Sequence, residues 1–173
     1  MIVCFGSAGL LLPQALQVTK EVPRTPKIAT ASQMTPMLNE AIAGMGSQVV
    51  VDLSDARVYL YGHERLLSSD PVAIGKAGWE TPTGSFKVLN MQHNPVWKQP
   101  ITGDLIPAGP DNPLGSRWIS FWSDDKHQIG FHGTNNDQLV GQRVSHGCLR
   151  MRNTDIEKLY EQVRVGTPVT VQN

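Results

Sequence analysis

Short alternations of apolar and polar residues, separated by turn residues, run through most of the chain after residue 48. Alternation with a period of two, bounded by Gly, Pro, Asn, Asp or Ser, is typical of β-strands that bury one face. The predicted strands cover Val49–Leu53, Val58–Tyr61, Pro71–Gly75, Phe86–Leu89, Trp118–Trp122, Gln128–Phe131 and Thr167–Val171. Many short strands at this spacing predict a mainly β domain of the sandwich or barrel type.

One segment near the C-terminus has helical periodicity instead. Its apolar residues recur at i, i+3, i+4 and i+7, which places them on a single buried stripe. The stripe consists of Ile156, Leu159, Tyr160 and Val163. We expect Asn153 to cap this helix and Gly166 to end it. The prediction is therefore one helix packed across a β-rich domain.

The segment Asn90–Ser116 fits neither pattern, because it is rich in Pro, Asn and Asp. An irregular excursion of this length in a compact domain usually serves function. We expect it to form a lid or a substrate wall.

Residues 1–47 differ in character from the rest of the chain. Ile2–Leu12 is uncharged and apolar, too short for the roughly 20 residues that span a bilayer but within the length of a signal-peptide core. Leu16–Ser32 reads as a linker, and a short helix is expected from Thr35. The predicted organisation is a leader, possibly a signal or anchor, with linker and short helix over 1–47, followed by one domain over 48–173. This leader predicts export.

The charge balance and the cysteine content exclude two classes of protein. The chain carries 15 Lys and Arg against 15 Asp and Glu, which argues against nucleic-acid binding because that function needs a basic excess. The two cysteines, Cys4 and Cys148, are too few for a disulfide scaffold. No role is assigned to Cys4.

Reactive side chains concentrate around Cys148. His146, Gly147 and Arg150 are its close neighbours in the sequence, and nearby positive charge favours the nucleophilic thiolate. A base within hydrogen-bond reach is also required. His132 lies far enough upstream to return on a neighbouring strand, and His146 competes for the role because alternate residues of an extended segment share a face.

Two other interpretations use the same residues or the tryptophans. A zinc site could be built from His127, His132, His146 and Cys148, but the spacing lacks the paired ligands of structural zinc sites, and no H-E-x-x-H motif is present. We therefore expect neither metal nor other cofactor. A non-catalytic binding module would use tryptophans for sugar stacking, although tryptophans are more often core and loop anchors. The candidates are Trp79, Trp97, Trp118 and Trp122.

The motif as a whole resembles that of the L,D-transpeptidase catalytic (YkuD-type) family. His132-Gly133, a gap, and then Ser145-His146-Gly147-Cys148 match its histidine and [S/T]-H-G-C elements. Thr81–Phe86 matches its T-P-x-G-x-F loop, and Gly166–Val169 matches its closing strand. The resemblance covers roughly residues 48–172 and implies a β-sandwich or barrel-like catalytic fold.

The resemblance also implies a role for each matching residue. Cys148 is the expected nucleophile, His132 its proton acceptor and donor, and His146 a supporting residue. The main-chain N–H groups of Gly147 and Cys148 are expected to form the oxyanion hole. Substrate contacts are expected from Arg150, Ser145 and Gly133.

Family members act on peptidoglycan stem peptides, so the implied partners are a donor and an acceptor stem, with no nucleic acid and no metal. The thiolate would attack the L-centre carbonyl of diaminopimelate, release D-alanine, and pass the acyl group to an amine in a 3→3 cross-link. Use of water instead would make an L,D-carboxypeptidase. A papain-like wall peptidase is a further alternative, although its Cys normally precedes its His and opens a helix, whereas here His132 comes first. The implied location is the periplasm or the cell-wall side of a bacterial inner membrane.

Overall fold

A computed structural model describes residues 46–99, 102–124 and 127–173. The predicted leader, linker and first short helix, together with Cys4, lie outside the described residues. None of the helices within these ranges is long and apolar enough to cross a membrane.

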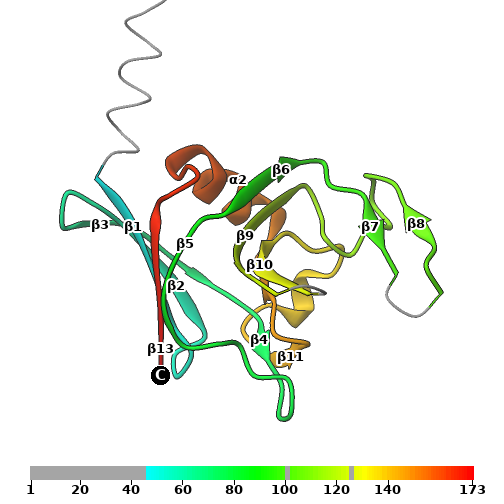
Figure 1. The fold of residues 1–173 in the computed structure, drawn as a ribbon, viewed down its shortest axis with the longest axis horizontal. Helices are drawn as coiled ribbons and strands as arrows, with labels where there is room; N and C mark the ends of the chain where they lie inside the picture. The colour runs from blue at the N-terminus through cyan, green and yellow to red at the C-terminus, as the bar shows by residue number, and fades with distance from the viewer. Residues whose placement is uncertain (1–45, 100–101, 125–126) are drawn as a thin grey trace, which may run out of the picture.

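The larger of two main sheets joins the two ends of the described domain (Figure 1). Its strand order is β3 (Arg65–Pro71), β2 (Arg57–Gly62), β1 (Ser47–Asp52), β13 (Pro168–Gln172) and β5 (Gly84–Lys87). The central pair, β1 and β13, runs parallel and sets Val49 beside Val169, whereas the other pairs are antiparallel. The last strand of the chain is thus an interior strand of the sheet.

The second sheet carries the residues of interest. Its order is β12 (Leu149–Arg150), β10 (Gln128–His132), β9 (Arg117–Ser123) and β6 (Asn90–His93). Strands β10 and β12 are parallel, and β9 is antiparallel to both β10 and β6. Two small sheets pair β4 (Ile74–Gly75) with β11 (Arg143–Ser145) and β7 (Trp97–Lys98) with β8 (Leu105–Ile106).

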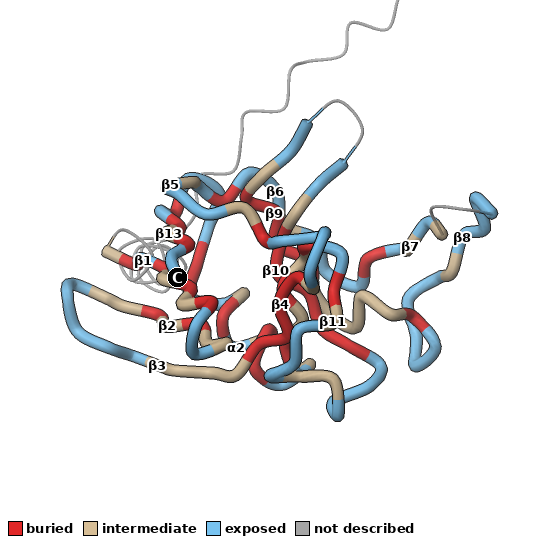
Figure 2. Tube along the Cα trace, turned by 90° about the horizontal axis from the view of Figure 1, so that it is seen from below, coloured by how far each residue is buried: buried red, intermediate tan, exposed pale blue. Residues whose placement is uncertain are grey.

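The core fills the space between the two main sheets and the helix α2 (Asn153–Gln162). Valines of β1, β2 and β13 meet the aromatic residues of β9 and β10, and Figure 2 shows the buried positions gathered in the interior. Phe121 packs between Phe86 and Phe131, with ring centroids 5.4 and 5.2 Å apart. Removal of this apolar surface from water, at about 25 cal/mol per Å², is the main stabilising contribution.

The mainly β architecture and the helix near the C-terminus confirm the predicted fold class. Three local predictions need correction. Pro71–Gly75 is not one strand, because β3 ends at Pro71 and β4 begins at Ile74. The segment Asn90–Ser116 is not wholly irregular, since it contains β6, β7 and β8.

The third correction concerns the helix ends. Asn153 is the first helical residue, Arg152 occupies the cap position, and no side-chain hydrogen bond caps the helix. Ile156, Leu159 and Val163 are buried as predicted, but the helix ends at Gln162, before Gly166. The side chain of Asn153 makes hydrogen bonds to other segments instead.

Candidate active site

A tight turn between β11 and β12 holds Cys148. In this cysteine turn, residues 145–148, the Ser145 hydroxyl donates to the Cys148 carbonyl (2.6 Å) and accepts from the Gly147 N–H (3.1 Å). Gly147 has φ +105°, and a Cβ there would lie 2.9 Å from Ile129 Cδ1. The backbone conformation therefore favours glycine at this position, whereas the Ile129 side chain could move aside for a Cβ.

A buried threonine fixes the cysteine turn to the small β4–β11 sheet. The Thr81 hydroxyl donates to the Gly147 carbonyl (2.9 Å) and accepts from the Gly75 N–H (3.1 Å). Thr81 is only 4% exposed, so water cannot replace these bonds. The threonine of the T-P-x-G-x-F motif thus supports the backbone of the cysteine.

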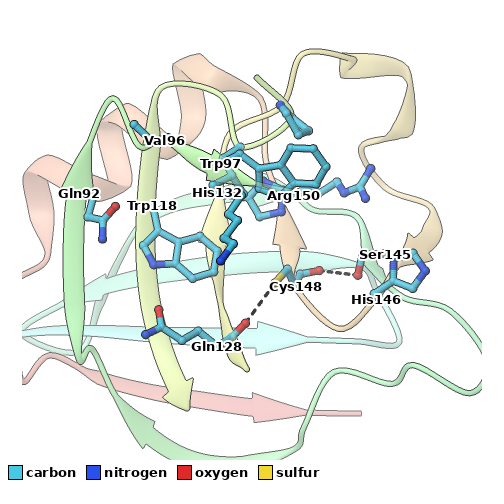
Figure 3. A pocket seen from close by; sticks show the side chains of 13 residues that line it. Gln92, Val96, Trp97, Trp118, Gln128, His132, Ser145, His146, Cys148 and Arg150 are labelled. Atoms are coloured by element: carbon cyan, nitrogen blue, oxygen red, sulfur yellow. Dashed lines mark hydrogen bonds between the residues drawn. The ribbon is translucent and has the colours of Figure 1, made fainter. Parts of the chain in front are cut away.

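His146 contacts an exposed tryptophan at the rim of the site. The rings of Trp79 and His146 pack edge to face, with an angle of 89° between their planes and 4.8 Å between their centroids. Because the chain turns at Gly147, the expectation that His146 and Cys148 share one face of an extended segment is wrong. Figure 3 shows the His146 ring directed away from the Cys148 sulfur.

His132 ends β10 directly beside β12. The parallel register sets Arg150 opposite His132, and the Met151 N–H donates to the His132 carbonyl (2.9 Å). The imidazole is buried and stacks on Trp118, with centroids 6.1 Å apart. The two strands therefore bring the predicted base and the residues around the thiol to the same edge of the sheet.

The hydrogen bond at Nδ1 decides the protonation of the His132 ring. Nδ1 lies 2.6 Å from the Gly133 carbonyl oxygen, and a carbonyl can only accept. Nδ1 therefore carries the proton of the neutral ring, and Nε2 keeps a lone pair for accepting one. This is the tautomer that a general base needs.

Burial keeps both reactive groups neutral. It lowers the pKa of His132 to about 4, with a further lowering by the Arg150 guanidinium, against the Gly133 and Pro113 carbonyls that favour the protonated ring. Burial also raises the pKa of the Cys148 thiol, opposed by the Gly130 N–H and by Arg150. At neutral pH the two side chains are therefore a thiol and a neutral imidazole in one cavity.

The resting thiol is oriented by a main-chain carbonyl. Cys148 Sγ donates to the Gln128 oxygen at 3.7 Å, and Figure 3 shows Cys148 linked to both Gln128 and Ser145. A register shift between Ile129 and Gly130 interrupts the regular pairing of β10 with β9 at this point. The irregular strand therefore faces the sulfur with a main-chain acceptor.

An open cavity of about 520 Å³ gives access to these groups. His132, Ser145, His146, Cys148 and Arg150 all line it. The opposite wall comes from the segment predicted to be a lid or substrate wall, through Val96, Trp97, Lys98, Pro113 and Leu114. The wall position agrees with that expectation.

Arg150 has an unused hydrogen-bonding group. Its Nε is buried and has no partner among the described residues. Its main chain is held by paired hydrogen bonds with Ala73 (2.8 and 3.0 Å). A planar guanidinium with an unpartnered N–H suits a carboxylate ligand.

Some predicted residues have different surroundings from those expected. The Ser145 hydroxyl and the Gly147 N–H bond to groups within the turn, whereas no described residue accepts from the Cys148 N–H. Gly133 contributes its carbonyl to His132. Within the described ranges, no cluster of three or more His, Cys, Asp or Glu is placed to hold a metal ion, and His127 lies exposed beside Asp124.

Sequence reasoning missed Gln128 and Pro113 as parts of the site, and it named Trp118 only as a candidate for sugar stacking. Gln128 and Pro113 act through main-chain carbonyls, which carry no side-chain signal. Thr81 had a signal, because it opens the T-P-x-G-x-F motif, but its two buried bonds depend on the tertiary fold.

Fold and site together define a class: a two-sheet β domain that presents a cysteine turn and a buried histidine from adjacent parallel strands. The sequence profile of the YkuD family, the L,D-transpeptidase catalytic domain, matches residues 46–171. The chain belongs to this family.

Curated relatives and solved structures agree with this assignment. The putative L,D-transpeptidase YqjB of Bacillus subtilis is 43% identical over 103 residues, 58% of this chain and 56% of the relative. The putative L,D-transpeptidase YkuD of Bacillus licheniformis is 35% identical over 124 residues, 72% of this chain and 64% of the relative. The probable L,D-transpeptidase ErfK/SrfK of Salmonella typhimurium is 36% identical over 137 residues, 71% of this chain and 43% of the relative. The matched part is thus about two fifths to two thirds of these relatives' length.

An L,D-transpeptidase from Mycobacterium smegmatis superimposes with a TM-score of 0.59 at 23% identity, covering 74% of this chain and 59% of that one. An L,D-transpeptidase solved in complex with imipenem gives a TM-score of 0.60 at 20% identity, covering 73% and 58%. At these identities the likeness shows the shared fold.

Proposed function

We propose that the chain is a peptidoglycan L,D-transpeptidase that uses Cys148 as nucleophile and His132 as general base and acid. The observation that carries the proposal is the Nδ1–H of His132 held by the Gly133 carbonyl, in the same cavity as the Cys148 thiol. The donor is a stem tetrapeptide, and the acceptor is the side-chain amine of another stem.

The first half of the reaction makes a thioester. The Cys148 thiol turns from the Gln128 carbonyl and passes its proton to His132 Nε2, and Sγ attacks the carbonyl at the L-centre of diaminopimelate. The oxyanion accepts from the Cys148 N–H, which supplies preorganised stabilisation. His132 then protonates the D-alanine amine, the C–N bond breaks, and D-alanine leaves.

The second half transfers the acyl group. The neutral imidazole takes a proton from the acceptor amine as that amine attacks the thioester. Collapse of the intermediate breaks the C–S bond, and the sulfur recovers its proton from His132. Two easier steps thus replace one difficult displacement.

Arg150 is proposed to bind a carboxylate of the stem peptide. Support comes from its buried, unpartnered Nε and its position opposite His132 in the strand register. Val96, Trp97 and Leu114 are proposed to shield the thioester from water on the other side of the cavity. A dry site favours the amine over hydrolysis.

The proposed location is outside the bacterial inner membrane, in the periplasm or on the wall side. The support is the apolar stretch Ile2–Leu12 in the sequence and the position of mature peptidoglycan. Fractionation of cells that express the full chain tests this point, and recovery of the protein only in the cytoplasm would contradict it.

The decisive experiment compares the wild-type chain with Cys148→Ala on disaccharide tetrapeptide muropeptides. Mass spectrometry of the products is expected to show 3→3 dimers and free D-alanine for wild type and neither for the variant. Imipenem serves as a second acyl donor, expected to add one covalent mass to wild type only. Cross-linking that survives Cys148→Ala overturns the proposal, and tripeptide without dimer assigns a carboxypeptidase.

A further inference from the structure

The side chain of Asn153, at the start of α2, joins two segments that are distant in sequence. Its Oδ1 accepts from the Ser116 N–H (3.0 Å), and its Nδ2 donates to the Thr134 carbonyl (2.9 Å). Ser116 directly precedes β9, and Thr134 follows the end of β10 by two residues. The Asn153 amide therefore connects the segment that leads into β9 with the segment that leaves β10 just after His132.

Two glycines leave the space that this amide occupies. A Cβ at Gly133 or at Gly115 would collide with Asn153 Oδ1. Gly133 has no positive φ, so its need for glycine comes from the Asn153 amide and not from its backbone conformation. The contact is thus close-packed on both segments, which restricts the movement of either.

The same two segments supply the main-chain acceptors of the imidazole. The Gly133 carbonyl accepts from His132 Nδ1, and the Pro113 carbonyl also faces the ring. Gly133 is bonded to Thr134, and Pro113 lies three residues before Ser116. Asn153 therefore holds the two backbone stretches on which the orientation of His132 depends, without touching the ring.

We propose that Asn153 is a positioning residue, which fixes the tautomer and orientation of His132 by locking the Gly133 carbonyl in place. The role in turnover rests on the proposed function, but the tautomer itself does not. If the Gly133 carbonyl moves, Nδ1–H loses its fixed partner. The ring then populates the Nε2–H tautomer, which cannot accept the thiol proton.

Several charged or titratable groups surround the ring. Arg150 on β12 acts on His132 directly, and Lys98 of β7, His146 and the Cys148 thiol share its cavity. Arg117 on β9 lies 3.8 Å from Glu157 on α2, so these two charges face each other. A new carboxylate at position 153 therefore adds negative charge behind the ring and raises the pKa of His132.

The experiment uses the full chain and the variants Asn153→Ala and Asn153→Asp, with Asn135→Asp as the matched charge control. Asn135 is exposed and lines the same cavity of about 250 Å³ as Asn153, but among the described residues its side chain bonds only to the Asp111 carbonyl. Three readouts are ¹⁵N NMR of the histidine rings, the pH profile of Cys148 alkylation by iodoacetamide, and kcat and KM for tetrapeptide. The His132 signal is assigned by its loss in His132→Gln.

In Asn153→Ala we expect mixed tautomers and, by analogy with partners that orient metal-ligating histidines, a kcat lower by about 10–100-fold, with KM unchanged. In Asn153→Asp the acid limb of alkylation moves to higher pH, because the carboxylate favours the protonated ring. Asn135→Asp behaves as wild type. Should the alanine variant fail to fold, the aspartate variant, which keeps the acceptor for Ser116, gives the result.

A single Nδ1–H tautomer and an unshifted pH profile in the Asn153 variants would overturn the proposal, even if stability falls. NMR and alkylation need no peptidoglycan, so they remain informative if the wild-type chain forms no cross-links. Loss of the proposed transpeptidase activity and loss of this positioning role are therefore distinguished.

Discussion

At the scale of single residues, the imidazole of His132 combines burial with a fixed donor. Its neighbours leave it neutral at physiological pH, because burial lowers its pKa to about 4. Because the buried ring binds a proton less readily than the same ring in the unfolded chain, acidification lowers the free energy of unfolding. The consequence is measurable as a loss of stability.

We predict that acidification destabilises wild type more than His132→Gln. The folded-state pKa, about 4, lies below the ordinary value of 6.5, so the unfolded chain binds the proton more readily in between. This contribution to stability is present above pH 6.5 and is lost as pH falls towards 4. Between pH 7.5 and 4.5 it amounts to about 2–3 kcal/mol.

Urea unfolding at both pH values, followed by circular dichroism, measures this difference. The glutamine variant lacks the titrating ring and retains every other acid-sensitive group. Equal losses of unfolding free energy in both proteins would show that the ring of His132 does not carry the effect.

The residue pair Cys148 and His132 could be predicted from sequence because each has a reactive side chain and the spacing allows neighbouring strands. The hydrogen bonds that orient these two side chains could not be predicted from the sequence. The carbonyls of Gln128 and Gly133 hold the thiol and the ring, and main-chain groups look alike at every position of a sequence. Asn153 was predicted as a helix cap because its side chain suits that role, but Ser116 and Thr134 compete for the same amide.

At the scale of elements, the cysteine turn is held in place by hydrogen bonds from the first residue of the T-P-x-G-x-F loop. The Thr81 hydroxyl bridges the Gly147 carbonyl and the Gly75 N–H. We predict that Thr81→Val, which keeps the shape, costs about 1–3 kcal/mol because it leaves buried main-chain groups unpaired. The substitution is also expected to slow Cys148 acylation, since the turn loses the hydrogen bond that holds the Gly147 carbonyl.

Thr83→Val is the matched control, because Thr83 is exposed on the same loop. Thermal unfolding and the rate of imipenem addition to Cys148 are the measurements. If the two valine variants are equally stable and equally reactive, the hydroxyl of Thr81 does not stabilise the cysteine turn.

Elements with their own pattern were predicted, and elements that depend on a partner were not. Strands such as β1 and β9 carry alternating or continuous apolar residues that face the core. By contrast, β6 has the mostly exposed sequence Asn-Met-Gln-His, and β7 and β8 have two residues each. These strands exist because a neighbouring strand offers hydrogen bonds, which local propensity does not record.

At the scale of the whole molecule, β13 connects parts of the domain from opposite ends of the chain. Val169 points inward and is fully buried, whereas Thr170, the next residue, is half-buried on the other face. We predict that Val169→Asp abolishes cooperative unfolding, because an unpaired buried carboxylate costs several kcal/mol. This is a large part of the roughly 5–15 kcal/mol that stabilises a typical domain.

Thr170→Asp introduces the same charge one residue away and is expected to keep a cooperative transition. Near-UV circular dichroism during urea titration compares the two variants. A native-like transition for Val169→Asp would mean that the two sheets hold together without β13 in its observed register.

The parallel pairing of β1 with β13 also has a kinetic consequence. Val49 and Val169 are neighbours although roughly 120 residues separate them, so this pair closes a loop that spans nearly the whole domain. The β1–β2–β3 meander can form from local contacts, but β1 keeps an open edge until the final strand arrives. Topologies dominated by such distant pairs fold slowly, and an open apolar edge invites association with other chains. A chain interrupted before residue 168 would therefore expose this edge permanently, which makes premature termination a route to aggregation.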